Sequence, residues 1–250
     1  MDIKEKMLEC EKAREFDKHI NEPNYDNVIE VDENFPYIKK GFRMKFRIFF
    51  DNLLVIRPYS FYLSVFKHKT KIIGKENLKE IKNAIFTCNH VDIFDCLIVK
   101  RALRRKLKIV AASFNNQKGS LGGWMRSGGM LPLSDNIGGM RKFNEAIKYY
   151  LERKHSILIY PETAMWYHYK KPRPHKVGAY HFSVKYNLPV IPLYITFKEN
   201  GNFVLHIMKP IYPNSTLDKK EASTDLMEKN MEAYKNKYEE FYGIELKYAD

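Results

Sequence analysis

The stretch AIFTCNHVDIFD, residues 84–95, combines a short apolar run with a histidine and two aspartates. The apolar residues at its start favour a buried strand. His90 follows this strand almost at once, and a helical segment is expected to begin near Asp95. Ligands of parallel sheets bind at the carboxyl ends of the strands. The stretch therefore predicts both a buried strand and a site at its end.

Further apolar runs of strand length follow, and segments with helical propensity lie among them. The runs are residues 107–112, 156–160, 190–197 and 203–208, and the helical segments are residues 95–105, 140–153 and 178–186. Strands that alternate with helices predict an α/β fold with a mostly parallel central sheet flanked by helices. A charged helix is expected over residues 225–245, with Ser223 or Thr224 as its cap.

The N-terminal part has a different pattern. Residues 4–20 favour a helix, and residues 21–37 read as a loop. Residues 41–66 are apolar and aromatic but are interrupted by basic side chains, and Pro58 predicts two short amphipathic helices. Such helices either lie in a membrane interface or cover the protein's own core. The expected division is residues 1–66, a membrane-associating helical segment, and residues 67–250, the α/β domain.

Composition limits the partners. Lys and Arg number 43 against 30 Asp and Glu, a net charge of +13. This charge suits nucleic acid, an anionic membrane or a phosphorylated substrate such as CoA, but no nucleic-acid-binding signature is found. Three cysteines without a paired spacing predict neither a disulfide framework nor a metal site, and favour a reducing compartment. The charged N-terminus is not a signal peptide, and no apolar stretch has transmembrane length.

His90 and Asp95 are the candidate catalytic pair. A carboxylate early in the helix would reach back to the imidazole and orient it as a general base. Asp92 competes for this role but suits a helix cap better. Cys88 is an alternative nucleophile, although a buried structural cysteine is the commoner case.

Further candidates follow the third strand. Glu162 comes directly after Tyr160-Pro161 and either contacts a substrate hydroxyl or is a solvated turn residue. The loop YHYKKPRPHK, residues 167–176, is basic and either holds a phosphate group or is simply solvated. Gly128-Gly129 permits a tight turn or a close backbone approach.

Taken in order, these motifs resemble those of the lysophospholipid (glycerolipid) acyltransferase family. Asn89-His90 with Asp95 matches its NHxxxxD block, and a Gly-rich segment runs into residues 130–133. Tyr160-Pro161-Glu162 resembles its FPEG block, and residues 188–192 (LPVIP) its VPVIP block. Residues 176–179 resemble a glycine segment that the family places between its last two blocks. The resemblance spans residues 70–210.

This resemblance implies a fold, a reaction and a set of site residues. His90 would be the general base and Asp95 its orienting partner. The acceptor hydroxyl would attack the thioester of acyl-CoA or acyl-carrier protein as co-substrate, with no resident cofactor or metal. The chain itself would bind an anionic membrane peripherally, at the cytoplasmic face, through its N-terminal helices. The implied substrate-binding residues are Asn89, Gly129, Glu162, Thr163, Lys171, Arg173 and Gly178.

The chain departs from the family pattern at two phosphate contacts. The second block ends in Leu133-Ser134-Asp135 rather than in Arg, and the third continues Glu162-Thr163 rather than Glu-Gly-Thr-Arg. The candidate substitutes for these contacts are Arg126, Arg141, Lys170, Lys171 or Arg173. The alternatives are an acceptor without phosphate, such as an amino-acid lipid or a secondary metabolite, and a thioester hydrolase.

Overall fold

The computed structural model describes residues 2–249. Its sheet has seven strands in the order β1-β7-β6-β2-β5-β3-β4. The strands are β1 (Lys71–Ile73), β2 (Ile85–Cys88), β3 (Leu107–Ala111), β4 (Met130–Pro132), β5 (Ser156–Ile159), β6 (Val190–Phe197) and β7 (Phe203–Ile207). β2 pairs in parallel with β6, and β3 with both β4 and β5. This confirms the predicted α/β fold with a mostly parallel sheet.

The antiparallel exception is β6 with β7. Residues 198–202 alone join these two strands, and Gly201 has a φ of +77°. A connection this short permits a hairpin, whereas parallel neighbours need a long crossover. All eight residues of β6 are buried, as expected for a strand covered on both faces.

The helices complete the α/β pattern. They are α1 (Ile3–Lys12), α2 (Phe42–Phe50), α3 (Arg57–Tyr62), α4 (Asp95–Leu103), α5 (Gly119–Ser127), α6 (Ile137–Glu152), α7 (His181–Tyr186) and α8 (Lys219–Tyr242). Short 3₁₀ turns occupy η3 (Lys75–Leu78), η4 (Ser113–Asn115) and η5 (Val177–Tyr180). Asp218, rather than Ser223 or Thr224, caps α8, because its carboxylate accepts from the N–H groups of Lys220 and Glu221.

The chain divides into two compact units. Unit 1 comprises Met1–Glu22, His68–Asp95 and Ile159–Asp250, and unit 2 comprises Pro23–Lys67 and Cys96–Leu158. One changeover, between Lys67 and His68, falls next to the boundary predicted after residue 66.

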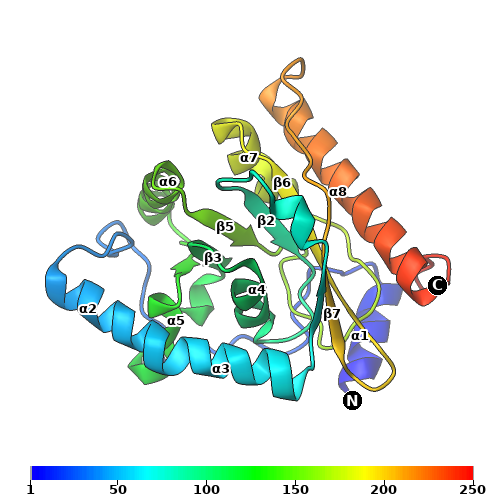
Figure 1. Cartoon of the computed structure of the whole chain (residues 1–250), viewed down its shortest axis with the longest axis horizontal. Helices are drawn as coiled ribbons and strands as arrows, with labels where there is room; N and C mark the ends of the chain where they lie inside the picture. The colour runs from blue at the N-terminus through cyan, green and yellow to red at the C-terminus, as the bar shows by residue number, and fades with distance from the viewer. Residues whose placement is uncertain (1, 250) are drawn as a thin grey trace. The chain divides into compact units, whose positions relative to one another are not determined.

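Unit 1 gathers both ends of the described chain. A cluster of buried side chains joins Phe16 and Ile20 to Ala164 and Trp166, with Tyr248 packed against it. The Ala249 N–H also donates to Glu11 Oε1 at 2.7 Å. α8 packs beside β6 and α7 (Figure 1), and its buried Asn230 accepts from the Thr87 hydroxyl at 2.6 Å. Residues 2–22 are therefore part of this unit rather than a free extension.

Unit 2 contains a helical run over residues 42–67. π-helical turns η1 (Asp51–Ile56) and η2 (Leu63–Lys67) follow α2 and α3 without a break, and Figure 1 shows the run as a continuous rod. The prediction of two helices divided at Pro58 was therefore wrong. Pro58 lies in the first turn of α3, where the absence of an N–H is tolerated. Among residues 2–249, no helix has the length and hydrophobicity needed to span a bilayer.

Candidate active site

The site begins where β2 ends. Asn89 is buried and extends the contact between β2 and β6 by side-chain bonds: its Oδ1 accepts from the Ile195 N–H at 2.7 Å, and its Nδ2 donates to the Ile195 carbonyl at 2.9 Å. Both groups of the amide are thus engaged with backbone. This geometry gives Asn89 a structural task, which is to fix the backbone from which His90 projects.

His90 and Asp95 form a close pair, as the sequence predicts. Nδ1 of His90 lies 2.9 Å from Oδ2 of Asp95. The Asp95 side chain is fully buried, whereas that of His90 is 22% exposed. An ionised carboxylate accepts only, so Nδ1 carries the proton and Nε2 presents a lone pair. A histidine held in this way is equipped to accept a proton from a hydroxyl group.

Three further donors hold the Asp95 carboxylate. The Tyr160 hydroxyl donates to Oδ1 at 2.5 Å, and the N–H groups of Val91 and Asp92 lie 3.2 and 3.4 Å from Oδ2. The Tyr160 ring also stacks on the imidazole of His90, with centroids 4.1 Å apart. Tyr160 thus touches both members of the pair. It stands where the FPEG-type block has Phe, and no pattern in the sequence indicates its contacts with His90 and Asp95.

Asp92 does not take the place of Asp95. Its Oδ1 accepts from the Phe94 N–H at 2.8 Å, in a turn that precedes α4, and its Oδ2 lies 3.8 Å from Nε2 of the buried His68. Cys88 is completely buried in β2, which favours the structural alternative over a nucleophile.

Glu162 and Arg173, both predicted to bind substrate, form a buried ion pair. Nη2 of Arg173 donates to Oε2 of Glu162 at 2.8 Å, and the Arg173 N–H donates to Oε1 at 3.0 Å. The guanidinium also donates to the carbonyls of Phe16 and Ala164. Each of the two side chains is at most 2% exposed. Substrate contact by either would require these bonds to break.

Glu162 nevertheless connects to the pair directly. Its Oε2 accepts from the N–H of His90 at 3.3 Å. On the following turn, the Trp166 N–H donates to the His90 carbonyl at 3.1 Å and the His168 N–H to that of Val91 at 2.9 Å. The segment after β5 therefore fixes the backbone of His90 on both sides.

The other predicted binding residues are placed as follows. Thr163 is exposed, with a φ of +66°, and its hydroxyl donates to the Glu162 carbonyl at 2.7 Å. Lys171 pairs with Glu11 at 2.5 Å. Burial acts to raise the pKa of Glu11, but the Lys171 ammonium and the Ala249 N–H hold that pKa below its usual value.

Two of the predicted glycines differ in their surroundings. Gly178 faces open space. Gly129 belongs to unit 2, where its φ is +109° and a Cβ would lie 2.6 Å from the Leu107 carbonyl oxygen. Its carbonyl also accepts from the Ile109 N–H. Gly129 therefore serves the close approach of β4 to β3.

His19 is a second histidine in electrostatic reach of the pair. Burial and then the charges of His90 and Arg173 lower the pKa of His19. Next to it, the carbonyl oxygen of Lys18 accepts a hydrogen bond from the Trp166 Nε1–H at 2.9 Å. No local motif predicts that His19 lies near His90, because this proximity depends on how residues 13–22 pack in unit 1. Among residues 2–249, no group of His, Cys, Asp or Glu side chains has the arrangement of a metal site.

Comparison with known proteins gives two findings. The family model "Acyltransferase" matches residues 69–196, about half of the chain, which includes His90, Asp95 and Glu162. Among solved structures, the chain is similar to the crystal structure of the 1-acyl-sn-glycerophosphate (LPA) acyltransferase PlsC from Thermotoga maritima. The TM-score is 0.58 and the identity 16%, over 86% of this chain and 89% of that one. No curated protein matches the chain by sequence.

Proposed function

Because the chain belongs to the acyltransferase family, we propose that it moves a fatty acyl chain from acyl-CoA or acyl-carrier protein to the hydroxyl of a lysophospholipid or a related lipid. The observation that carries this proposal is the His90–Asp95 pair. A buried carboxylate lies 2.9 Å from the imidazole, and the imidazole itself is partly exposed. This arrangement suits a general base that acts on a bound hydroxyl.

In the proposed reaction, Nε2 of His90 takes the proton of the acceptor hydroxyl as its oxygen attacks the thioester carbonyl. The new C–O bond forms, the C–S bond breaks, and the leaving thiolate takes that proton from the imidazolium, which restores neutral His90. Asp95 stabilises the positive imidazolium between these steps. No protein nucleophile is needed, in line with the burial of Cys88.

A separate question is whether the head group of the acceptor carries a phosphate. Arg173 was a candidate for the family's missing phosphate contact, but it is committed to Glu162 and to two backbone carbonyls. This commitment supports, as a second candidate, acyl transfer to a lipid without a phosphate. Water in place of the acceptor would give a thioester hydrolase, so the products have to be identified.

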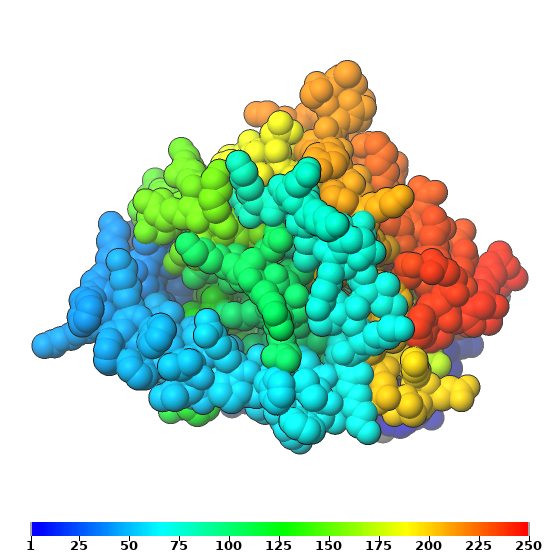
Figure 2. Space-filling view, viewed as in Figure 1, coloured from blue at the N-terminus to red at the C-terminus, as the bar shows by residue number. Residues whose placement is uncertain are grey.

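We also propose that the helical run of residues 42–67 lies in the interface of an anionic membrane, at the cytoplasmic leaflet. Many of its apolar side chains are exposed; the most exposed are Phe42 (80%), Leu54 (65%) and Phe66 (61%). Figure 2 shows the run, coloured blue to cyan, on the surface of the molecule. Exposed aromatic side chains with interspersed Lys and Arg suit a bilayer interface, and the net charge of +13 favours anionic lipids.

The test is mass spectrometry of the products. The protein would be mixed with acyl-CoA or acyl-carrier protein and with lysophospholipids and phosphate-free lipid alcohols. We expect an acylated lipid that forms with the unmodified chain and is lost in His90→Ala. His181→Ala is the matched control, because His181 is exposed and forms no part of the pair.

The product identifies the reaction. An acylated lysophospholipid supports the first candidate, and an acylated lipid alcohol supports the second. Free fatty acid as the sole product, still dependent on His90, would replace acyl transfer by hydrolysis. Equal turnover in His90→Ala and the unmodified chain would refute the proposed mechanism.

A further inference from the structure

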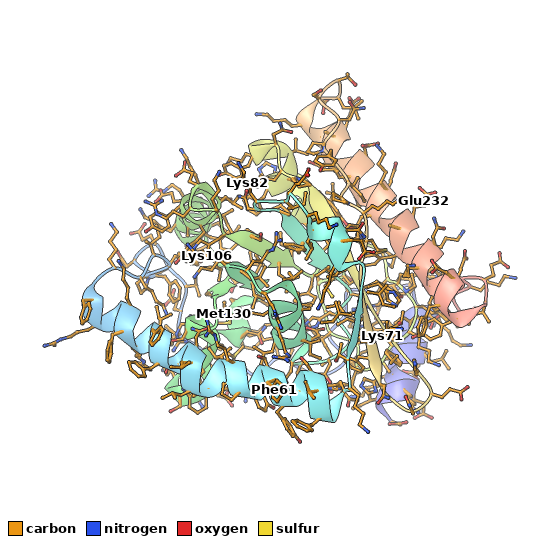
Figure 3. All side chains as sticks on the ribbon, in the orientation of Figure 1. Phe61, Lys71, Lys82, Lys106, Met130 and Glu232 are labelled. Atoms are coloured by element: carbon orange, nitrogen blue, oxygen red, sulfur yellow. The ribbon has the colours of Figure 1, made fainter. Side chains whose placement is uncertain are left out.

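A run of nine residues, KRALRRKLK at positions 100–108, contains six Lys or Arg residues. It covers the last turn of α4 and the start of β3. Figure 3 labels Lys106 where the chain passes between these elements. A surface helix end with several cations is common, so the run alone implies nothing about a ligand.

These six side chains all line one cavity, and Arg57 adds a seventh cation. The cavity has a volume of about 730 Å³ and lies within unit 2. Among the residues that the structure describes, no Asp or Glu lines this cavity. Asn52, Ser60 and Ser127 add uncharged polar groups. The cavity thus gathers seven positive charges without an acidic side chain in its wall.

Contacts to uncharged groups position three of these cations, Lys100, Arg101 and Lys108. Nζ of Lys100 donates to Oδ1 of Asn52 at 3.2 Å and to the Gly128 carbonyl. Nζ of Lys108 lies 4.0 Å from the centre of the Tyr150 ring, and Arg101 lies over Phe61. Amides, carbonyls and rings orient a cation but carry no full negative charge.

Two of the lysines in this cavity have lowered pKa values, because burial and neighbouring cations disfavour their charged form. Burial, together with the charge of Arg57, lowers the pKa of Lys100 to about 8. Burial, together with the charges of Lys100 and Lys39, lowers the pKa of Lys108 to about 8. An anion in the cavity would relieve both repulsion and desolvation, and would bind more tightly for that reason.

We propose that this cavity binds a phosphate ester that carries at least two negative charges. Arg and Lys are the side chains that recognise phosphate oxygens best. The volume exceeds that of a phosphate group and leaves room for what the phosphate is attached to. The proposal does not depend on the acyltransferase reaction, because His90 and Asp95 do not line this cavity.

Two sources would supply such a group: a lipid head group and a soluble phosphate ester. Ile48, Asn52, Ile56, Arg57 and Ser60 line the cavity and belong to the helical run of residues 42–67. Other side chains of the same run form the exposed apolar surface. If that surface meets a bilayer, head groups are within reach of the cavity, and both sources therefore enter the test.

The test compares a double variant, Lys106→Gln with Lys108→Met, with the control Lys219→Gln with Lys220→Gln. Both remove two positive charges, but the control lies in the exposed first turn of α8 and not in the cavity. One arm measures the affinity of the full chain for inorganic pyrophosphate by calorimetry. The other measures its binding to phosphatidylcholine vesicles with and without phosphatidic acid. Thermal unfolding of each variant is recorded in both cases.

We expect the affinity of the cavity variant to fall about tenfold or more in at least one arm, because each cation near an anionic surface contributes about fivefold to the affinity. The affinity of the control should change by less than about threefold. Loss in the vesicle arm identifies a lipid head group, and loss in the pyrophosphate arm alone identifies a soluble ester. The unfolding temperature of the cavity variant should not fall below that of the unmodified chain, because Lys108→Met removes a half-buried charge. Equal losses in the two variants, or no loss in either, would overturn the proposal.

Discussion

At the scale of single residues, Tyr160 is the group that ties the candidate pair together. Its hydroxyl donates to Asp95 at 2.5 Å, and its ring lies against the His90 imidazole. Because these contacts are to His90 and Asp95 themselves, we regard Tyr160 as a positioning residue. A hydrogen bond to a charged partner is worth about 1.5–3 kcal/mol, and its loss would leave the pair less well oriented.

We therefore expect Tyr160→Phe to lower kcat by about tenfold or more, with little change in KM. Steady-state kinetics with the acceptor found by product analysis would measure this split. Tyr167→Phe is the matched control, since Tyr167 is exposed on the following turn. The positioning role would be excluded by an unchanged kcat. It would also be excluded by a fall in kcat that merely follows a loss of folded protein in thermal unfolding.

Thr163 shows strain at the same site. A β-branched residue at a φ of +66° is uncommon and costly. The FPEG-type block has glycine at this position, and glycine adopts such a conformation without strain.

Thr163→Gly should therefore raise the free energy of unfolding by about 0.5–1 kcal/mol, after the entropic cost of glycine is subtracted. Chemical denaturation would measure the change. Thr224→Gly is the comparison, because Thr224 is a half-buried residue within α8, and glycine inside a helix costs about 1 kcal/mol. If both variants lose stability to a similar degree, the positive φ of Thr163 carries no strain.

Some site residues were predictable from the sequence and others were not. His90 and Asp95 are five residues apart, next to a strand end, so local geometry suffices to pair them. Glu162 and Arg173 were found by motif and by charge, but their mutual pairing in the interior depends on how residues 160–176 fold back. No local pattern distinguishes a solvated basic loop from one whose arginine is buried.

At the scale of elements, the longest apolar runs gave the most reliable predictions. β6 begins and ends where the sequence predicts, and β2, β3, β5 and β7 differ by one residue at an end. β1, β4 and α5 were not predicted. The two strands have only three residues each, too few for a periodic signal, and α5 contains three glycines. Its helical state depends on packing in unit 2 rather than on propensity.

The exposed side of the helical run of residues 42–67 leads to a prediction about membranes. Phe46, Phe49 and Leu54 are all more than half exposed, so their replacement by Ser removes little packing. We expect the triple variant to float with anionic vesicles about tenfold or more weakly, because each buried apolar side chain contributes about 1.5–3 kcal/mol.

Ile137→Ser is the control for that experiment, since Ile137 is 91% exposed at the start of α6. It should not change flotation. Deletion of residues 1–66 would be a poorer test, because residues 2–22 pack into unit 1 beside the turn that holds His90. Unchanged flotation of the triple variant would place the membrane contact elsewhere.

At the scale of the whole molecule, buried histidines make stability depend on pH. Burial, with the charge of Arg173, lowers the pKa of His175 from 6.5 to about 3. Burial, with the charge of Lys237, lowers the pKa of His206 to about 4. Burial, with the charges of Lys108, Lys106 and Arg153, lowers the pKa of His155 to about 4. These residues occur in both units, so acid should weaken both.

The sign follows from proton binding. Below pH 6.5 the unfolded chain binds protons at these three residues, and the folded chain does not until the pH approaches 4. Stability is therefore fully present above pH 6.5 and is lost as the pH falls towards 4. Each histidine contributes at most about 1.4 kcal/mol per pH unit to this slope. Urea unfolding at a series of pH values would measure it.

A single substitution separates this effect from general acid denaturation. In His206→Gln, the amide keeps a hydrogen-bond partner for the Thr196 hydroxyl, which lies 2.9 Å from Nε2 of His206, but it no longer titrates. Its unfolding free energy should therefore fall less steeply between pH 6.5 and 4 than that of the unmodified chain. His181→Gln is the control at an exposed position, and it should leave the slope unchanged. Parallel slopes in all three proteins would show that carboxylates, rather than buried histidines, govern the acid sensitivity of the molecule.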